Sequence, residues 1–263
     1  IRPLTLELFA CKALRFRTAA ALLLMHSHFR IRDVELFDGI VAESDHISPV
    51  LAGRLLRGMA PLGHPVKAVM LAIDQSFGSH TWQRSLPALT ADLFAAALLD
   101  FKYLSEETVN ALFQAAKVHC ANPDLNLPAP LRLKCAGELS ASSHAWLRQA
   151  KNTGDATWCA DWAEEVFSAS NGPQHELVPV VDGGLLRSVF ASLQDYAKVN
   201  HGEILAGWPV QGFRADLVCR LPTQLLIIEV NSQQRFYLGT RRELLASCRL
   251  RRAALESGGK VCQ

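Results

Sequence analysis

The sequence lacks the cysteine and histidine spacings of a structural metal site. Its seven cysteines are scattered over 263 residues, their number is odd, and no two form a C-x-x-C pair. None of the nine histidines has a second histidine four residues later. These absences exclude the common zinc modules and argue against a dense disulfide scaffold. We therefore expect no metal and no cofactor, and we interpret the cysteines as small core residues in a reducing compartment.

The sequence also lacks a hydrophobic run long enough to cross a bilayer. Its most apolar stretch, Thr18 to Met25, is flanked by Arg17 and His26 and is far shorter than the roughly 20 residues that a membrane helix needs. We therefore expect no membrane partner. Because the chain begins with Ile1 rather than Met, we expect an upstream segment, and a cleaved organellar presequence is one source of it.

The net charge of the chain is small, at +2, but the charge is unevenly distributed and the C-terminal end is basic. Residues 232–263 contain seven basic side chains against two acidic ones, which gives +5 and leaves −3 for the rest of the chain. A local basic footprint is typical of a surface that binds a polyanion, and the alternative is a solvated helix face. The candidate polyanion-binding residues are Arg235, Arg241, Arg242, Arg249, Arg251, Arg252 and Lys260.

Helical periodicity dominates residues 1–200. Apolar residues at spacings of three and four predict helices over 4–29, 32–41, 50–59, 66–77, 86–101, 105–118, 131–150, 157–169 and 185–199. Ser105 is the expected N-cap of its helix, and the tryptophans near residues 146–162 are expected to fill packing space. Similar helix starts recur roughly every 35–40 residues, which predicts helix–turn–helix units stacked in a solenoid. The alternative is an irregular helical bundle.

Strand patterns appear only after residue 200. The segments 213–219 and 225–230 predict two strands joined by a proline turn, and 260–262 predicts another strand. The fold class is therefore α+β with two domains. An α-helical, solenoid-like repeat array occupies 1–200, and a small α/β domain occupies 201–263.

A helix is predicted between these last strands. Thr240 and Glu243 match a capping box at its start. The predicted buried stripe of this helix is Leu244, Cys248 and Leu255.

Two carboxylates are predicted to meet at one end of the small sheet. Asp216 and Glu229 lie on adjacent strands, and an acidic residue followed on the next strand by Glu-x-Lys is an arrangement of metal-dependent nucleases. Asn231 stands where the lysine would be, and a neutral amide cannot supply its charge. Asp216, Glu229 and Asn231 are therefore degenerate catalytic candidates. The alternative is that Glu229 is a structural carboxylate bonded to loop amides or to an arginine.

The C-terminal unit resembles the RAP domain family. The likeness lies in Glu229 to Tyr237, Leu238 to Thr240 and Arg251 to Val261, which are similar to that family's Glu-Val-Asp-Gly-Pro-x-His-Phe run, its Thr-x-x-Lys-x-Arg-x-Leu helix and its Gly-Tyr/Trp-x-Val end. The resemblance implies an endonuclease-like α/β fold that follows helical repeats, RNA binding, and work on organellar transcripts or ribosomal RNA. Two departures, Asn231 for Asp and Arg235 for His, weaken the metal site and favour phosphate binding over hydrolysis.

From these features we expect a non-catalytic RNA-binding protein of an organelle. The mitochondrion is the expected location, with a chloroplast or other plastid as the alternative. The expected partner is ribosomal RNA or an organellar transcript, together with ribosomal proteins if the chain is a mitochondrial ribosome component, and no DNA is expected. Two other functions stay open. A metal-dependent RNA-processing endonuclease would need Asp216 and Glu229 for cleavage, and a protein–protein scaffold would keep its partners after RNase treatment.

Overall fold

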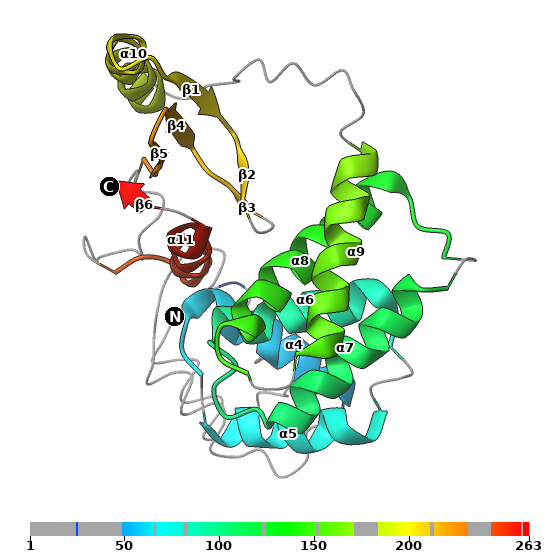
Figure 1. Ribbon diagram of the computed structural model, residues 1–263. Helices are drawn as coiled ribbons and strands as arrows, with labels where there is room; N and C mark the ends of the chain where they lie inside the picture. Colours follow the sequence, from blue (N-terminus) through cyan, green and yellow to red (C-terminus); the bar gives the residue numbers. More distant parts are fainter. Residues whose placement is uncertain are drawn as a thin grey trace.

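The chain is mostly helical with a small β-sheet, which confirms the predicted α+β class (Figure 1). A computed structural model describes residues 25, 49–65, 67–80, 84–122, 125–150, 153–170, 184–210, 213–230, 243–258 and 260–262. The helices predicted over 4–29 and 32–41 lie outside these ranges, apart from Met25.

Six of the described helices pack in two layers. In one layer α4 packs on α6 and α6 on α8, and in the other α5 packs on α7 and α7 on α9. Each helix of the first layer also packs against its successor in the chain, because α4 contacts α5, α6 contacts α7 and α8 contacts α9. The bounds are α4 Pro49–Met59, α5 Lys67–His80, α6 Leu86–Leu98, α7 Glu106–Cys120, α8 Ala129–Leu147 and α9 Gly154–Ser170, with a 3₁₀ turn η1 at Ala60–Leu62.

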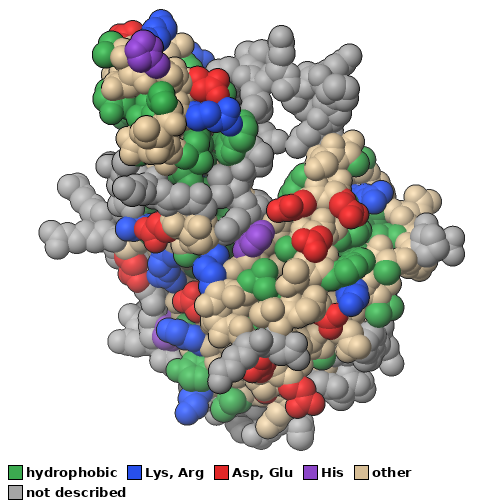
Figure 2. All heavy atoms as spheres, in the orientation of Figure 1, with side chains coloured by type: hydrophobic (Ala, Val, Ile, Leu, Met, Phe, Trp, Pro, Cys, Tyr) green, Lys and Arg blue, Asp and Glu red, His purple; other side chains and the backbone are tan. Residues whose placement is uncertain are grey.

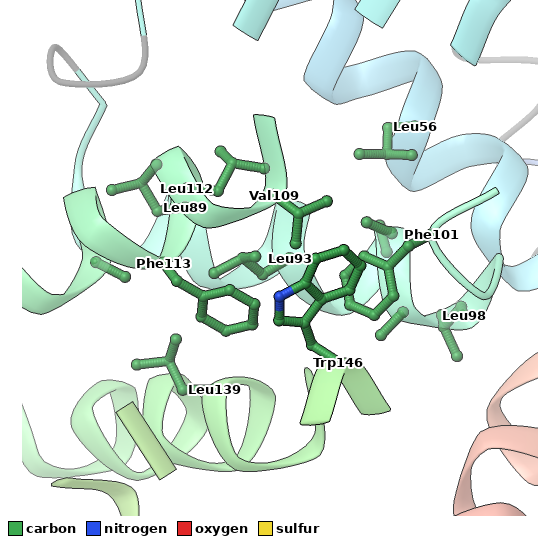
Figure 3. Packing of buried hydrophobic residues seen from close by; sticks show 14 of the residues in the cluster. Leu56, Leu89, Leu93, Leu98, Phe101, Val109, Leu112, Phe113, Leu139 and Trp146 are labelled. Carbon is green, nitrogen blue, oxygen red and sulfur yellow. The ribbon is translucent and has the colours of Figure 1, made fainter. Parts of the chain in front are cut away.

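Aromatic packing joins these layers. The Trp146 ring of α8 meets Phe101 edge-to-face, with 5.0 Å between ring centroids (Figure 3). The indole N–H of Trp146 donates to Asn110 Oδ1 of α7 at 3.1 Å. Phe113 and Leu93 lie beside this pair in the same core. Trp146 therefore has the packing role predicted from the sequence, with its one polar atom satisfied.

The start of α7 is fixed by its cap. The Thr108 N–H donates to Ser105 Oγ at 3.2 Å, as predicted for an N-cap. Ser105 in turn donates from its N–H and its hydroxyl to Asp74 Oδ1 of α5, at 2.8 and 2.9 Å. The cap therefore also ties α7 to the neighbouring helix of its layer.

The main sheet has the strand order β1-β4-β5-β6. Strand β4 is antiparallel to β1 and β5, and β6 is parallel to β5. The predicted hairpin and the predicted last strand are therefore present. The bounds are β1 Glu203–Ala206, β4 Leu217–Leu221, β5 Gln224–Ile228 and β6 Lys260–Cys262, with a separate antiparallel pair of β2 Pro209–Val210 and β3 Phe213–Arg214.

The strand predicted over 213–219 is wrong at its centre. The chain leaves β3 after Arg214 and enters β4 at Leu217. Between them the Ala215 N–H donates to Trp208 O at 2.8 Å, and Asp216 O accepts from the Gly207 N–H at 3.2 Å. These bonds bend the chain from the small ribbon into the main sheet, so Asp216 stands at a corner.

Helix α10, Gly184–Val199, packs against β1 and β4 (Figure 1). It precedes the predicted domain boundary at residue 200, but its described contacts are with the sheet. Its apolar side chains Leu186 and Phe190 are half-buried, and Ala197 is the residue that is fully buried in the described helix.

Helix α11, Ala246–Gly258, lies between the sheet and the helical layers (Figure 1). Ala246 and Leu250 are buried in the core of the helical layers, whereas Leu255 is buried in the small core of the sheet with Val218 and Ile227. This double packing makes α11 the element that joins the two parts.

The predicted start of this last helix is wrong. Residues 243–245 are not helical, so Glu243 cannot close a capping box within the helix, and Thr240 lies outside the described residues. The predicted stripe is also only partly right, because Leu244 and Cys248 are half-buried while Leu255 is buried. Packing of Ala246 and Leu250 against the helical layers overrides the local capping signal.

Candidate functional site

Asp216 and Glu229 meet at the end of the sheet where β4 begins and β5 ends. The Asp216 N–H donates to Glu229 Oε1 at 3.1 Å, and the Val230 N–H donates to Asp216 Oδ2 at 2.8 Å. Their side chains are only 12% and 7% exposed. The antiparallel register, which pairs Leu217 with Ile228, brings the two acids together as predicted.

One atom of α11 bridges the two acids. Arg251 Nη2 lies 2.7 Å from Asp216 Oδ1 and 2.8 Å from Glu229 Oε1, and the arginine side chain is 21% exposed. A charge-assisted contact to both carboxylates at this distance is a strong interaction in a partly buried site. The guanidinium therefore stands between the acids, where a nuclease would hold a divalent cation.

This geometry favours a structural role for the acid pair. Glu229 accepts hydrogen bonds from a corner amide and from Arg251, which is the arrangement expected of a structural carboxylate. A bound metal would have to displace the guanidinium, since like charges repel at such short range. Among the described residues no group of three or more His, Cys, Asp or Glu side chains is arranged to hold a metal ion.

The other predicted site residues divide into two groups. Arg249 is half-buried, Arg252 is exposed and paired with Glu256 Oε1 at 2.7 Å, and Lys260 opens β6 opposite Leu226. Of the predicted arginines on α11, Arg251 therefore contacts Asp216 and Glu229, whereas Arg252 lies on the solvent-exposed side of the helix. The predicted site residues that lie outside the described residues are Asn231, Arg235, Arg241 and Arg242.

Acidic and basic side chains are distributed unevenly over the visible face. Figure 2 shows Lys and Arg side chains interspersed with acidic ones around α11, and acidic side chains gathered over α9. On α9 the exposed Asp161, Glu164 and Glu165 form this acidic group. A polyanion would be repelled by α9, so the surface near α11 is the better candidate.

A second charged cluster is buried between helices. Asp92 of α6 is fully buried and lies 2.7 Å from Arg84 and 3.7 Å from Arg57 of α4. Burial raises the pKa of Asp92 to about 6, and the two arginines oppose that shift. Neither Asp92 oxygen accepts a hydrogen bond from the described chain, so desolvation is poorly offset. Nearby, the Thr90 hydroxyl donates to Glu138 Oε2 at 2.6 Å.

We predict opposite effects for two glycine-to-alanine changes. A Cβ at Gly53 would collide with Arg84 Nη2 and lie 2.9 Å from Asp92 Oδ1. Gly53→Ala should gain about 1 kcal/mol of helix propensity but lose roughly 3 kcal/mol by separating the buried pair, which leaves a net destabilisation of about 2 kcal/mol. At Gly137 of α8 the nearest atom to a Cβ is Phe167 Cζ at 3.9 Å, so Gly137→Ala should stabilise by up to about 1 kcal/mol. Urea unfolding of both variants measures the difference, and equal effects at the two glycines would contradict it.

Other features of the described chain do not form a site. Cys120, Cys135, Cys159 and Cys219 are free and buried, as predicted for core residues, and burial raises the pKa of the Cys159 thiol to about 12. Such thiols are poor nucleophiles. None of the described helices combines the length and apolarity needed to cross a membrane.

No family model matches the chain, and no curated protein matches it.

Two roles were not foreseen from the sequence. Arg251 is one of the arginines predicted to bind phosphate, but the neutral Asn231 at the usual lysine position is a signal that another cation lies near the acid pair. The signal for Asp92 is its position three residues after Leu89, which places it on the buried face of an apolar helix. Arg251 is 35 residues from Asp216 in the sequence, and Arg57, one of the two arginines beside Asp92, comes from another helix.

Proposed function

We propose that the chain is a non-catalytic RNA-binding protein of an organelle, with a RAP-like C-terminal domain of endonuclease-like fold. The observation that carries the proposal is the bridge from Arg251 Nη2 to Asp216 and Glu229, at 2.7 and 2.8 Å. It places a cation of the chain itself between the two carboxylates, where it balances one of their two negative charges. In this proposal the remaining basic side chains of the C-terminal end bind RNA phosphates and take no part in metal-assisted hydrolysis.

The helical layers support a repeat array in this proposal. Helices α4, α6 and α8 begin at residues 49, 86 and 129, and each packs on the next member of its layer. Contacts restricted to the preceding and following units are the pattern of an α-solenoid, whose units repeat at about 40 residues. Such arrays offer an extended surface to a long ligand, and single-stranded RNA is a ligand of that shape.

The mitochondrion is the proposed location, and ribosomal RNA or an organellar transcript is the proposed ligand. Both follow from the resemblance to RAP domains that follow helical arrays. Membership of the mitochondrial ribosome is the more specific form of the proposal, because ribosomal RNA is held by proteins that bind it without cleaving it.

The test is a salt series with labelled RNA. For single strands the logarithm of affinity falls with the logarithm of salt concentration at a slope of about −0.7 per phosphate contact. The double variant Arg249→Ala/Arg252→Ala should therefore reduce the slope by up to about 1.4. Arg187→Ala/Lys198→Ala, which removes two exposed cations from α10, is the charge-matched control and should leave the slope unchanged.

Three results would contradict the proposal. A salt-independent affinity, or equal slopes for the α11 double variant and the α10 control, would remove the phosphate-binding role of α11. Cleavage of the RNA with Mg²⁺ or Mn²⁺ that disappears in Glu229→Ala would favour the endonuclease instead. Protein partners that survive RNase treatment, with no RNA bound, would favour the scaffold.

A further inference from the structure

The turn between α6 and α7 holds an aromatic ring at the surface on a constrained backbone. Asp100, Phe101 and Tyr103 all have positive φ, at 53°, 52° and 64°. Residues other than glycine rarely adopt this left-handed region, and an aromatic residue there is costly unless its surroundings enforce it. Residues with such a local cost cluster at active sites and ligand-binding sites.

Both ends of this turn are anchored. On one side the Phe101 ring is 4% exposed and packs edge-to-face on Trp146 (Figure 3). On the other side Ser105 is bonded through its N–H and its hydroxyl to Asp74 Oδ1. Within the turn the Phe101 N–H donates to Ala96 O at 2.9 Å. The backbone that carries Tyr103 is therefore fixed before any ligand arrives.

Tyr103 itself points to solvent beside cationic side chains. Its residue is 45% exposed, and Lys67 Nζ of α5 lies 5.9 Å from the ring centroid. Lys102, the preceding residue, is also exposed. Lys67 lies over one face of the ring, and an exposed aromatic ring with a basic side chain close by is an arrangement with which proteins stack a nucleobase.

The charge around Tyr103 is balanced. Glu106 and Glu107 lie in the first turn of α7, and Asp100 faces Arg148. These acids limit the attraction of the turn for phosphate. Any contribution of Tyr103 to RNA affinity must therefore come mainly from stacking, which depends little on salt, and not from charge.

We propose that Tyr103 is a stacking platform for an unpaired base of single-stranded RNA, which would stack on the ring face opposite Lys67. This site rests on the proposed RNA-binding function and extends it, because it lies at a turn of the helical layers, apart from α11. It gives the helical layers a defined contact with the ligand, whereas the arginines of α11 hold phosphates. The two sites differ in their expected response to salt.

The test uses a short fluorescein-labelled oligouridine and the same oligomer made with abasic sites. Tyr103→Ala should weaken binding of the oligouridine roughly tenfold, which corresponds to the lower part of the range for one stacked base, and should leave the salt slope unchanged. Tyr103→Phe should bind like the wild type, since it keeps the ring. On the abasic oligomer, Tyr103→Ala and wild type should bind equally.

Tyr196→Ala is the matched control. Tyr196 of α10 is 47% exposed, close to the 45% of Tyr103, so both variants remove a similarly exposed tyrosine, and thermal melting checks that each is folded. If Tyr103→Ala bound oligouridine as tightly as the wild type, or if Tyr196→Ala lost as much affinity as Tyr103→Ala, the stacking site would be overturned while RNA binding stayed intact. A smaller salt slope in Tyr103→Ala would also overturn it, since charge would then dominate. Absence of RNA binding by the wild type would overturn the proposed function as well.

Discussion

Replacing Arg251 with alanine is expected to lower the free energy of unfolding by about 3 kcal/mol. The change leaves the carboxylates of Asp216 and Glu229, which are 12% and 7% exposed, without the cation that bridges them. Their mutual repulsion would open the corner between β3 and β4 and loosen α11 from the sheet. Denaturant unfolding followed by circular dichroism measures the loss.

Two further variants separate the bridge from a general loss of charge. Arg252→Ala removes the next arginine of α11, whose pair with Glu256 is exposed, and should change stability by less than about 1 kcal/mol. The triple variant Asp216→Asn/Glu229→Gln/Arg251→Met removes all three charges together and should recover most of the stability, because no buried charge is left unpaired. Equal losses for Arg251→Ala and Arg252→Ala would contradict the bridging role.

The stability of the chain is expected to depend on Asp92 between pH 4 and pH 7. Its folded-state pKa of about 6 lies above the ordinary value of about 3.9. The folded chain therefore binds the proton more tightly than the unfolded chain. The contribution of Asp92 is fully present below about pH 4 and is lost as the pH rises through 6, by about 3 kcal/mol in total.

The groups that face Asp92 are Arg57 from α4, Arg84 before α6 and Glu138 from α8. Asp92→Asn removes the titrating group but keeps its shape, so the variant should lose this part of the pH dependence. The measurement is the free energy of unfolding of wild type and variant at pH 4, 5, 6 and 7. The difference between the two proteins should change by about 2 kcal/mol across that range, whereas parallel profiles would contradict the raised pKa.

Local features of the sequence predicted most of the elements. Helix periodicity located α4 to α10, the polar cap at Ser105 was right, and the apolar run before Glu229 gave the position of β5. These signals depend on neighbouring residues alone, because caps, turns and amphipathic faces are short-range properties.

Features that depend on remote partners were predicted poorly. The start of α11 is set by burial of Ala246 and Leu250 against helices far earlier in the chain, not by the local capping pattern. The acid pair was predicted to converge, because strand register is a local consequence of the hairpin, but its cation comes from a helix beyond β5. Which of several arginines turns inward depends on tertiary packing, and charge counting cannot show it.

The most direct test of RNA binding by α11 is photo-crosslinking of the full chain to thiouridine-containing RNA, followed by mass spectrometry of the crosslinked peptides. The proposal predicts adducts on peptides that contain the α11 residues Arg249 and Arg252, with loss of these adducts at high salt. Adducts confined to the acidic α9 surface, or no adducts on α11 at low salt, would contradict it.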